Sequence, residues 1–140
     1  MRYFFIEKDQ LYTTSPIISG WRNQFNKVDN ILDRSVFHIK SNSETVFTDI
    51  ISIPFLLFSH EAFKIINRYE RMLRSKKIAL IDVENNFTRI YHLPINIDTA
   101  RDKAIFYLDD IENKKLVINL ELAESILRRN LIGFDLKEMK

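Results

Sequence analysis

The chain has 140 residues, of which 46% are hydrophobic and 12% aromatic, so it is long enough to bury a core without disulfide staples. It has no cysteine, which excludes disulfides and thiolate metal sites, and only two glycines, which excludes a glycine-rich phosphate loop. A formal net charge of +2 neither requires nor excludes a polyanionic partner.

The first part of the chain predicts two strands separated by a loop. Tyr3 to Glu7 favours a first strand, and Val36 to Lys40 favours a weaker second one. The segment from Tyr12 to Trp21 predicts a loop, because the residue before Pro16 is biased to extended geometry. Trp21, the only tryptophan, is interpreted either as a core or lid residue or as part of a partner surface, where tryptophan is enriched.

The central part of the chain predicts a strand, a proline turn, a helix and a second strand. The strand Val46 to Ser52 should end just before Pro54, which lacks an amide hydrogen. Ser59 then stands where a helix N-cap is wanted, and apolar residues at helical spacing predict a helix from about His60 to Arg74. Ile78 to Val83 is a nearly continuous aliphatic run, which is typical of a strand covered on both faces.

The last part of the chain alternates short strands with turns and one further helix. Glu84 to Asn86 predicts a turn that joins two strands in a hairpin. The remaining predicted elements are a strand at Phe87 to Leu93, a helical turn from about Asp98 to Arg101, strands at Ala104 to Leu108 and Leu116 to Asn119, a helix from Asn119 or Leu120 through the Arg128 and Arg129 turn, and a strand at Leu131 to Leu136. Together they predict a single α+β domain over residues 1–140, with a mostly antiparallel sheet packed with two main helices.

Motifs for catalysis, cofactors or metals are missing from the sequence. His38, His60 and His92 lie far apart without metal-ligand spacing, which favours a structural or surface role for each. Asp109 and Asp110 belong to an acidic cluster that lacks the ligand pattern of a calcium loop, so a solvated turn is the simpler interpretation. We therefore expect no catalytic residue, no cofactor and no metal, although a site assembled only in space stays open.

The predicted helix after Ser59 carries a basic stripe. Lys64, Arg68 and Arg71 share one of its faces, and clustered cations on one surface are what phosphate contacts require. Glu61 and Glu70 dilute the stripe, so an ordinary solvated helix face is the preferred interpretation and nucleic acid the alternative partner.

Three segments of the chain resemble one protein family. They are SPIISGW at residues 15–21, DII-x-x-P at residues 49–54 followed by FLLFSHEAFKII, and LAESILRRNLIG at residues 122–133. In the same order along the chain, they resemble immunity proteins from bacterial polymorphic toxin systems, which are small cytoplasmic α+β proteins encoded beside a toxin. The resemblance implies that the chain is not an enzyme and that it binds and neutralises a cognate toxin protein.

The resemblance also suggests candidate partner-binding residues. Trp21, Glu124, Arg128 and Arg129 lie in the resembling segments, although the two arginines would also suit a helix end that pairs with carboxylates. Inhibitors of nucleic-acid-cleaving toxins are often acidic, whereas this chain has a pI near 8.8, so the Asp109 and Asp110 patch is a further candidate contact. We expect no membrane contact, because the apolar run at residues 46–58 is too short to span a bilayer. We expect a cytoplasmic protein, because the apolar stretch Tyr3 to Ile6 is too short for a secretory signal and the chain has no cysteine.

Overall fold

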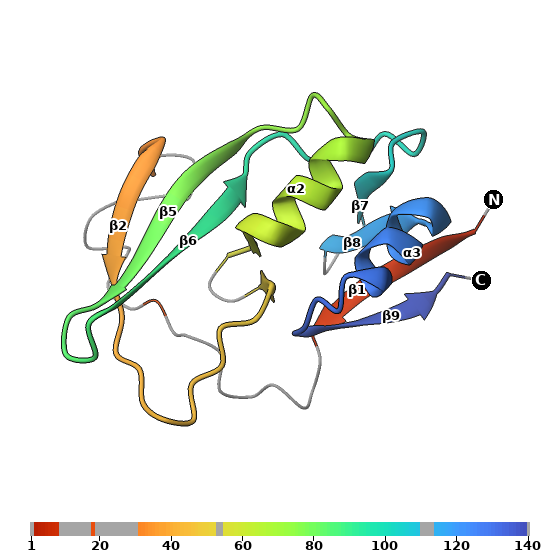
Figure 1. The fold of residues 1–140 in the computed structure, drawn as a ribbon. Helices are drawn as coiled ribbons and strands as arrows, with labels where there is room; N and C mark the ends of the chain where they lie inside the picture. Colours follow the sequence, from red (N-terminus) through yellow and green to blue (C-terminus); the bar gives the residue numbers. More distant parts are fainter. Residues whose placement is uncertain (1, 9–17, 19–30, 53–54, 110–113, 140) are drawn as a thin grey trace.

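The computed structural model describes residues 2–8, 18, 31–52, 55–109 and 114–139. In these residues two helices and nine strands form two mostly antiparallel sheets (Figure 1), which confirms the predicted α+β class but divides the predicted sheet in two. The strands are β1 (Tyr3–Lys8), β2 (Arg34–His38), β3 (Ile50–Ile51), β4 (Leu57–Ser59), β5 (Ser75–Asp82), β6 (Phe87–Pro94), β7 (Ile105–Asp109), β8 (Lys114–Asn119) and β9 (Phe134–Glu138). The helices are α2 (His60–Tyr69) and α3 (Leu120–Arg128).

The two sheets differ in the strands they join. The first has the order β7-β8-β1-β9, so the first strand of the chain lies between the last strand and a hairpin. The second has the order β2-β5-β6-β4-β3, in which β2 pairs with β5 in parallel and the other pairs are antiparallel. The predicted hairpin of β5 and β6 is confirmed, with a register that runs from Ser75 opposite Pro94 to Asp82 opposite Phe87.

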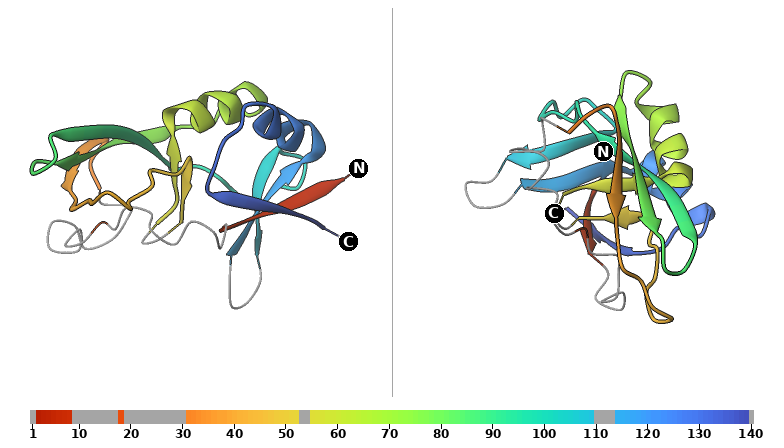
Figure 2. Two further views of the ribbon diagram at one scale, coloured as in Figure 1. Left: turned by 60° about the horizontal axis from the view of Figure 1, so that its bottom comes forward. Right: turned by 90° about the vertical axis from the view of Figure 1, so that its left-hand side faces the viewer.

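Both helices pack against a core that the two sheets share. Phe58 of the second sheet and Ile118 of the first belong to one buried cluster, together with the apolar faces of α2 and α3. The helices touch through the Tyr69 hydroxyl, which lies 2.7 Å from the Ser125 hydroxyl oxygen. Figure 2 shows them side by side on the same side of the molecule. A second buried cluster, which includes Phe37 and Tyr91, covers the other face of the second sheet. No helix in the described ranges is long and apolar enough to cross a membrane.

Helix α2 begins where the sequence predicts but ends five residues earlier than Arg74. Its N-cap Ser59 accepts a hydrogen bond from the amide of Ala62 at 3.1 Å, as the sequence indicates. It ends at Tyr69 because Asn67 donates from its side chain to the carbonyls of Glu70 and Leu73, at 3.0 and 3.1 Å. The chain therefore turns at residues 70–74 and enters β5 three residues before the predicted start of that strand.

The predicted strand Val46 to Ser52 shrinks to the two residues of β3. The amide of Asp49 donates to the carbonyl of Ile132 at 2.9 Å, and its carbonyl accepts from Ser59 at 2.7 Å. The carbonyl of Thr48 accepts from the hydroxyl of Tyr91 at 2.7 Å. The backbone before β3 is thus hydrogen-bonded to distant segments, and these hydrogen bonds take the place of those of a longer strand.

Three further predictions are wrong at the level of single elements. Strand β9 begins at Phe134 rather than Leu131, because Gly133 has a φ of 97° and the residue before it is bonded to Asp49. Residues 98–101 form bends and a turn instead of a helical turn. Strand β5 is not covered on both faces: Ile78 and Leu80 are buried, whereas Ala79 and Ile81 are only half-buried. The other predicted strands lie within two residues of the observed ones.

Candidate partner-binding surface

The described residues leave open one face of the sheet formed by β2, β5 and β6. Side chains alternate along β5, so that Ile78, Leu80 and Asp82 enter the second core cluster or its edge while Lys77 and Ala79 point the other way. Figure 2 shows these three strands extending beyond α2, at the opposite end of the molecule from α3. Helix α2 therefore covers only the near end of this face.

The strand register arranges this face in three rows. Residues directly opposite one another in neighbouring strands share a face, so each row takes one residue from β2, one from β5 and one from β6. The rows are Arg34, Lys77 and His92; Val36, Ala79 and Ile90; and His38, Ile81 and Thr88. We call these nine residues the open face. Its middle row is apolar but poorly covered, since Val36 is 47% and Ile90 44% exposed.

The open face is hollowed where it meets the start of α2. The hollow has a volume of about 820 Å³, and its floor includes the apolar row. Arg34 and Lys77 line it from the sheet, and His60 and Glu61 line it from the first turn of α2. The site thus offers an apolar floor beside charged groups, which is the composition of many protein-binding surfaces.

Two cations face each other in the first row of the open face. Arg34 and Lys77 are exposed and directly opposite in the parallel pair of β2 and β5. The ion pairs among the described residues are Arg2 with Glu138 and Arg128 with Glu124, so no described acid pairs with either cation. Arg89 also borders the hollow, but its guanidinium carbon lies 6.0 Å from the ring centre of Tyr91, whose side chain belongs to the opposite face.

His92 ends the first row in a chain of hydrogen-bonded side chains. Its Nδ1 lies 2.8 Å from the hydroxyl of Ser75, and its Nε2 lies 3.0 Å from Nδ1 of His60. The ring of Phe63 stacks on it at a centroid distance of 4.4 Å. Burial, followed by the charges of His60 and Lys77, lowers the pKa of His92 to about 4, so this imidazole is neutral at neutral pH. These contacts tie α2 to β5 and β6 at the edge of the hollow.

The contact between His60 and His92 was not predicted from the sequence, because 32 residues separate them. The pairing of strands brings them together, and this pairing cannot be deduced from the sequence. Ser75 does not line the hollow, and the described residues hold no group of three or more His, Cys, Asp or Glu placed to bind a metal. The two histidines therefore hold the edge of the hollow in place, and we assign them no catalytic or metal-binding role.

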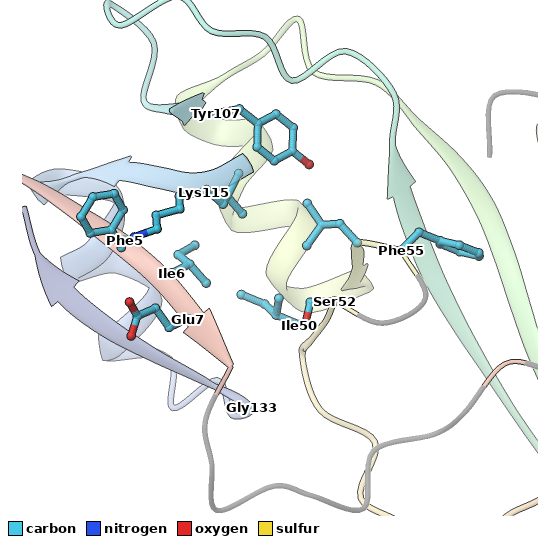
Figure 3. A pocket seen from close by; sticks show the side chains of 11 residues that line it. Phe5, Ile6, Glu7, Ile50, Ser52, Phe55, Tyr107, Lys115 and Gly133 are labelled. Atoms are coloured by element: carbon cyan, nitrogen blue, oxygen red, sulfur yellow. The ribbon is translucent and has the colours of Figure 1, made fainter. Parts of the chain in front are cut away.

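A second cavity, of about 550 Å³, lies between the two sheets (Figure 3). Ile6 of β1 and Ile50 of β3 line it from opposite sheets, and Tyr107 and Lys115 add a hydroxyl and an ammonium group. Burial raises the pKa of Tyr107, so its hydroxyl stays protonated at neutral pH. Most of the apolar lining is continuous with the shared core, so we assign this cavity no function.

The candidate residues from the third resembling segment lie on α3, away from the open face. Glu124 and Arg128 are exposed and form an ion pair at 3.6 Å, as the alternative interpretation of Arg128 predicts. Arg129 is the C-cap residue and is also exposed. Asp109 is the last residue of β7, opposite Lys114, whereas Asp110 and Trp21 lie outside the described residues. Figure 1 shows α3 and β7 at the opposite end of the molecule from β2, and no described residue of α3 or β7 lines the hollow.

The basic stripe on α2 is shorter than predicted. Lys64 and Arg68 are exposed and lie one helical turn apart, but Arg71 follows the end of the helix and sits in the turn. Lys64 also lies one turn after His60, which lines the hollow. The stripe therefore begins beside the open face rather than forming a separate long surface.

Two of the resembling segments meet at the junction of the sheets. Asp49, from the second segment, is hydrogen-bonded to Ile132 of the third segment through both its backbone and its carboxylate. Ser59, also in the second segment, donates its hydroxyl to the same carboxylate at 2.7 Å. The residues that carry the resemblance are thus residues that hold this fold together. No protein-family model matches the chain, and no curated protein sequence matches it.

Proposed function

We propose that this chain is a non-enzymatic, cytoplasmic immunity protein that binds and neutralises a cognate bacterial toxin domain. The observation that carries the proposal is the open face, where exposed apolar side chains line the floor of a hollow and charged groups form its rim. Binding to such a surface is favoured because water is excluded from the apolar row, which contributes about 25 cal/mol for each Å² of apolar surface buried.

The open face also suits tight binding because it is built on strands. Val36, Ala79 and Ile90 are held in one row by the ladders of β2, β5 and β6, so little backbone conformational entropy is lost when a partner docks. Inhibition by covering an active site needs shape and a few buried anchors, and it needs no acid, base or nucleophile of its own.

The resemblance supports the proposal because the residues of the open face lie outside the resembling segments. Asp49 and Ile132 in the resembling segments maintain the junction of the sheets, whereas Arg34, Val36, Lys77 and Ile90 lie outside those segments. A surface that must fit one cognate toxin is expected to differ between proteins that share a fold. His60 and Glu61 at the rim of the hollow lie within the second segment, and the rest of this division fits a common frame with an individual binding face.

Nucleic acid remains the alternative partner. Lys64 and Arg68 are exposed on adjacent turns of α2, and no described acid forms an ion pair with them. If they contact phosphates, binding to single- or double-stranded nucleic acid should weaken steeply with added salt, and charge reversal at Arg68 and Arg71 should abolish it.

The test of the proposal is co-expression with the product of the gene immediately upstream. We expect the wild-type chain to restore growth and to co-purify with that product. Ile90→Asp should abolish both, because it places a charge on the apolar floor, while the circular dichroism spectrum stays unchanged.

Leu127→Asp is the matched control. Leu127 is a 60% exposed side chain on α3, beside Glu124 and Arg128. It should preserve growth and complex formation. Full protection by Ile90→Asp with loss of protection by Leu127→Asp would move the binding site to α3. A toxic neighbour that neither binds the well-expressed wild-type chain nor is neutralised by it would overturn the immunity function for that pair.

A further inference from the structure

Arg34 and Lys77 form an arrangement that costs the free protein stability. Like charges directly opposite one another in neighbouring strands repel and destabilise the pairing. Both side chains are exposed, and the strand ladder fixes their backbones side by side. A sheet that served folding alone would favour an acid at one of these two positions.

The groups around this pair leave it positively charged. Glu61 lines the same hollow, but it lies in the first turn of α2, where a carboxylate interacts favourably with the positive end of the helix. His92 is neutral at neutral pH, and His60 is hydrogen-bonded to it. His38 is the remaining titratable group of the open face and lies in the third row, two residues beyond Val36 on β2. Arg89 at the border of the hollow is directed towards the ring of Tyr91 on the opposite face, so the open face itself presents Arg34 and Lys77 against the single described carboxylate of Glu61.

The apolar row lies immediately beside the cations. Val36 and Ala79 follow Arg34 and Lys77 by two residues along their strands, a step of about 7 Å at about 3.3 Å for each residue. A partner segment that satisfies both rows must present an acid and an apolar side chain about 7 Å apart. Alternate residues of an extended segment have this spacing.

We propose that the toxin segment seated in the hollow carries an Asp or Glu side chain that docks between Arg34 and Lys77, with an apolar side chain against Val36, Ala79 and Ile90. This inference rests on the proposed immunity function and specifies the chemistry of the partner. An acidic protein segment fits better than a nucleic acid, because a phosphate backbone offers nothing to the apolar row and two cations make few phosphate contacts. Charge complementarity here sets the rate of association and the choice of partner.

The experiment measures two properties of Lys77→Glu and Arg34→Glu, each made in the full chain. The first is the dissociation constant for the upstream gene product, at low and at high salt. The second is the melting temperature of the chain alone. Lys137→Glu is the matched control, because Lys137 is an exposed lysine on β9 of the other sheet.

We expect each of the two variants to weaken binding by about tenfold or more at low salt and to reduce its salt dependence. Their melting temperatures should stay equal to or rise above that of the wild-type chain, because the repulsion is relieved. Lys137→Glu should change neither property. A merely structural role for Arg34 or Lys77 would not combine weaker binding with unchanged or higher stability.

Two outcomes overturn the inference, and they differ from each other. If the wild-type chain binds the upstream product and the variants bind within about twofold, the acidic contact is wrong while the immunity function stands. If the wild-type chain does not bind the product at all, the proposed function fails and the inference fails with it. If Lys77→Glu loses binding and a lysine placed at one acidic position of the product restores it, that position carries the docking carboxylate.

Discussion

Asp49 and Ile132 are joined by two hydrogen bonds across 83 residues of sequence. The amide of Asp49 donates to the carbonyl of Ile132 at 2.9 Å, and the amide of Ile132 donates to Oδ2 of Asp49 at 2.7 Å. The other carboxylate oxygen accepts from the hydroxyl of Ser59, the N-cap of α2. One buried carboxylate thus links the segment before β3, the start of α2 and the segment before β9.

Asp49→Asn should destabilise the protein by about 2–3 kcal/mol, since hydrogen bonds to a buried charged group contribute about 1.5–3 kcal/mol. The Asn side chain can present only one acceptor oxygen to the two donors, and its amide group would face the other donor. Chemical denaturation gives the change in the free energy of unfolding. Asp135→Asn, at an exposed position on β9, is the control and should change stability by less than about 0.5 kcal/mol. Equal stability of the two variants would contradict the role given to Asp49.

Gly133→Ala should cost about 3 kcal/mol or more. Gly133 has a φ of 97°, and a β-carbon there would lie 2.3 Å from the β-carbon of Thr48. Because the neighbouring atoms belong to the stem of a short side chain, they cannot turn aside. The melting temperature and the denaturation midpoint should both fall.

The comparison for this change is Asn130→Gly. Asn130 also has a positive φ, of 54°, in the turn after α3. Glycine adopts this conformation without steric cost, so Asn130→Gly should be neutral within about 0.5 kcal/mol. A Gly133→Ala variant as stable as Asn130→Gly would show that the approach to Thr48 is not tight.

Stability should depend on pH through His92. Its pKa is lowered to about 4 in the folded protein, whereas an unfolded chain titrates near 6.5, so the unfolded state binds more protons between these values. The contribution of His92 is therefore fully present above about pH 6.5 and is lost as the pH falls towards 4, by up to about 3 kcal/mol at about 1.4 kcal/mol for each pKa unit.

His92→Gln should remove this slope from the plot of unfolding free energy against pH. Glutamine keeps hydrogen-bonding capacity towards Ser75 and His60 but does not titrate. His38→Gln, at an exposed position on the open face, should leave the slope in place. An unchanged slope in His92→Gln would assign the pH dependence to another group.

Removal of the exposed ion pair on α3 should have little effect on stability. Glu124 and Arg128 lie one helical turn apart with a separation of 3.6 Å, and exposed pairs of this kind contribute about 0.3–0.5 kcal/mol. Glu124→Ala should therefore lower the melting temperature only slightly. Thermal unfolding at low and high salt checks this, and a loss of more than about 1 kcal/mol would indicate a further contact of Glu124.

Local signals in the sequence determined the type and order of most elements. Ser59 and Asn119 mark the starts of the two helices, because a side-chain oxygen at an N-cap satisfies an amide only two or three residues away. The hairpin of β5 and β6 was also predictable, since two apolar runs separated by a short polar turn have few other ways to pair. These features depend on neighbours in the chain.

Element ends were decided by particular hydrogen bonds, some of them between distant residues. Helix α2 ends early because Asn67 closes the following turn, and the carboxylate of Glu70 accepts a hydrogen bond from the amide of Ala104. The strand before Ser52 is short because Asp49 is paired with Ile132. Helix and strand propensities contain no information about such partners, so the predicted boundaries were wrong there.

The candidate surface was invisible in the sequence for a similar reason. Arg34 and Lys77, which are 43 residues apart in the sequence, become neighbours through the parallel register of β2 and β5. The aliphatic run from Ile78 predicted a strand covered on both faces. The prediction was wrong because an apolar sequence does not show whether another element packs on each face of its strand. The sequence alone determined that β5 is an apolar strand. Only the tertiary structure decided that α2 packs on this sheet at His92 and that the described residues leave Val36 and Ile90 exposed and Ala79 half-buried beside two cations.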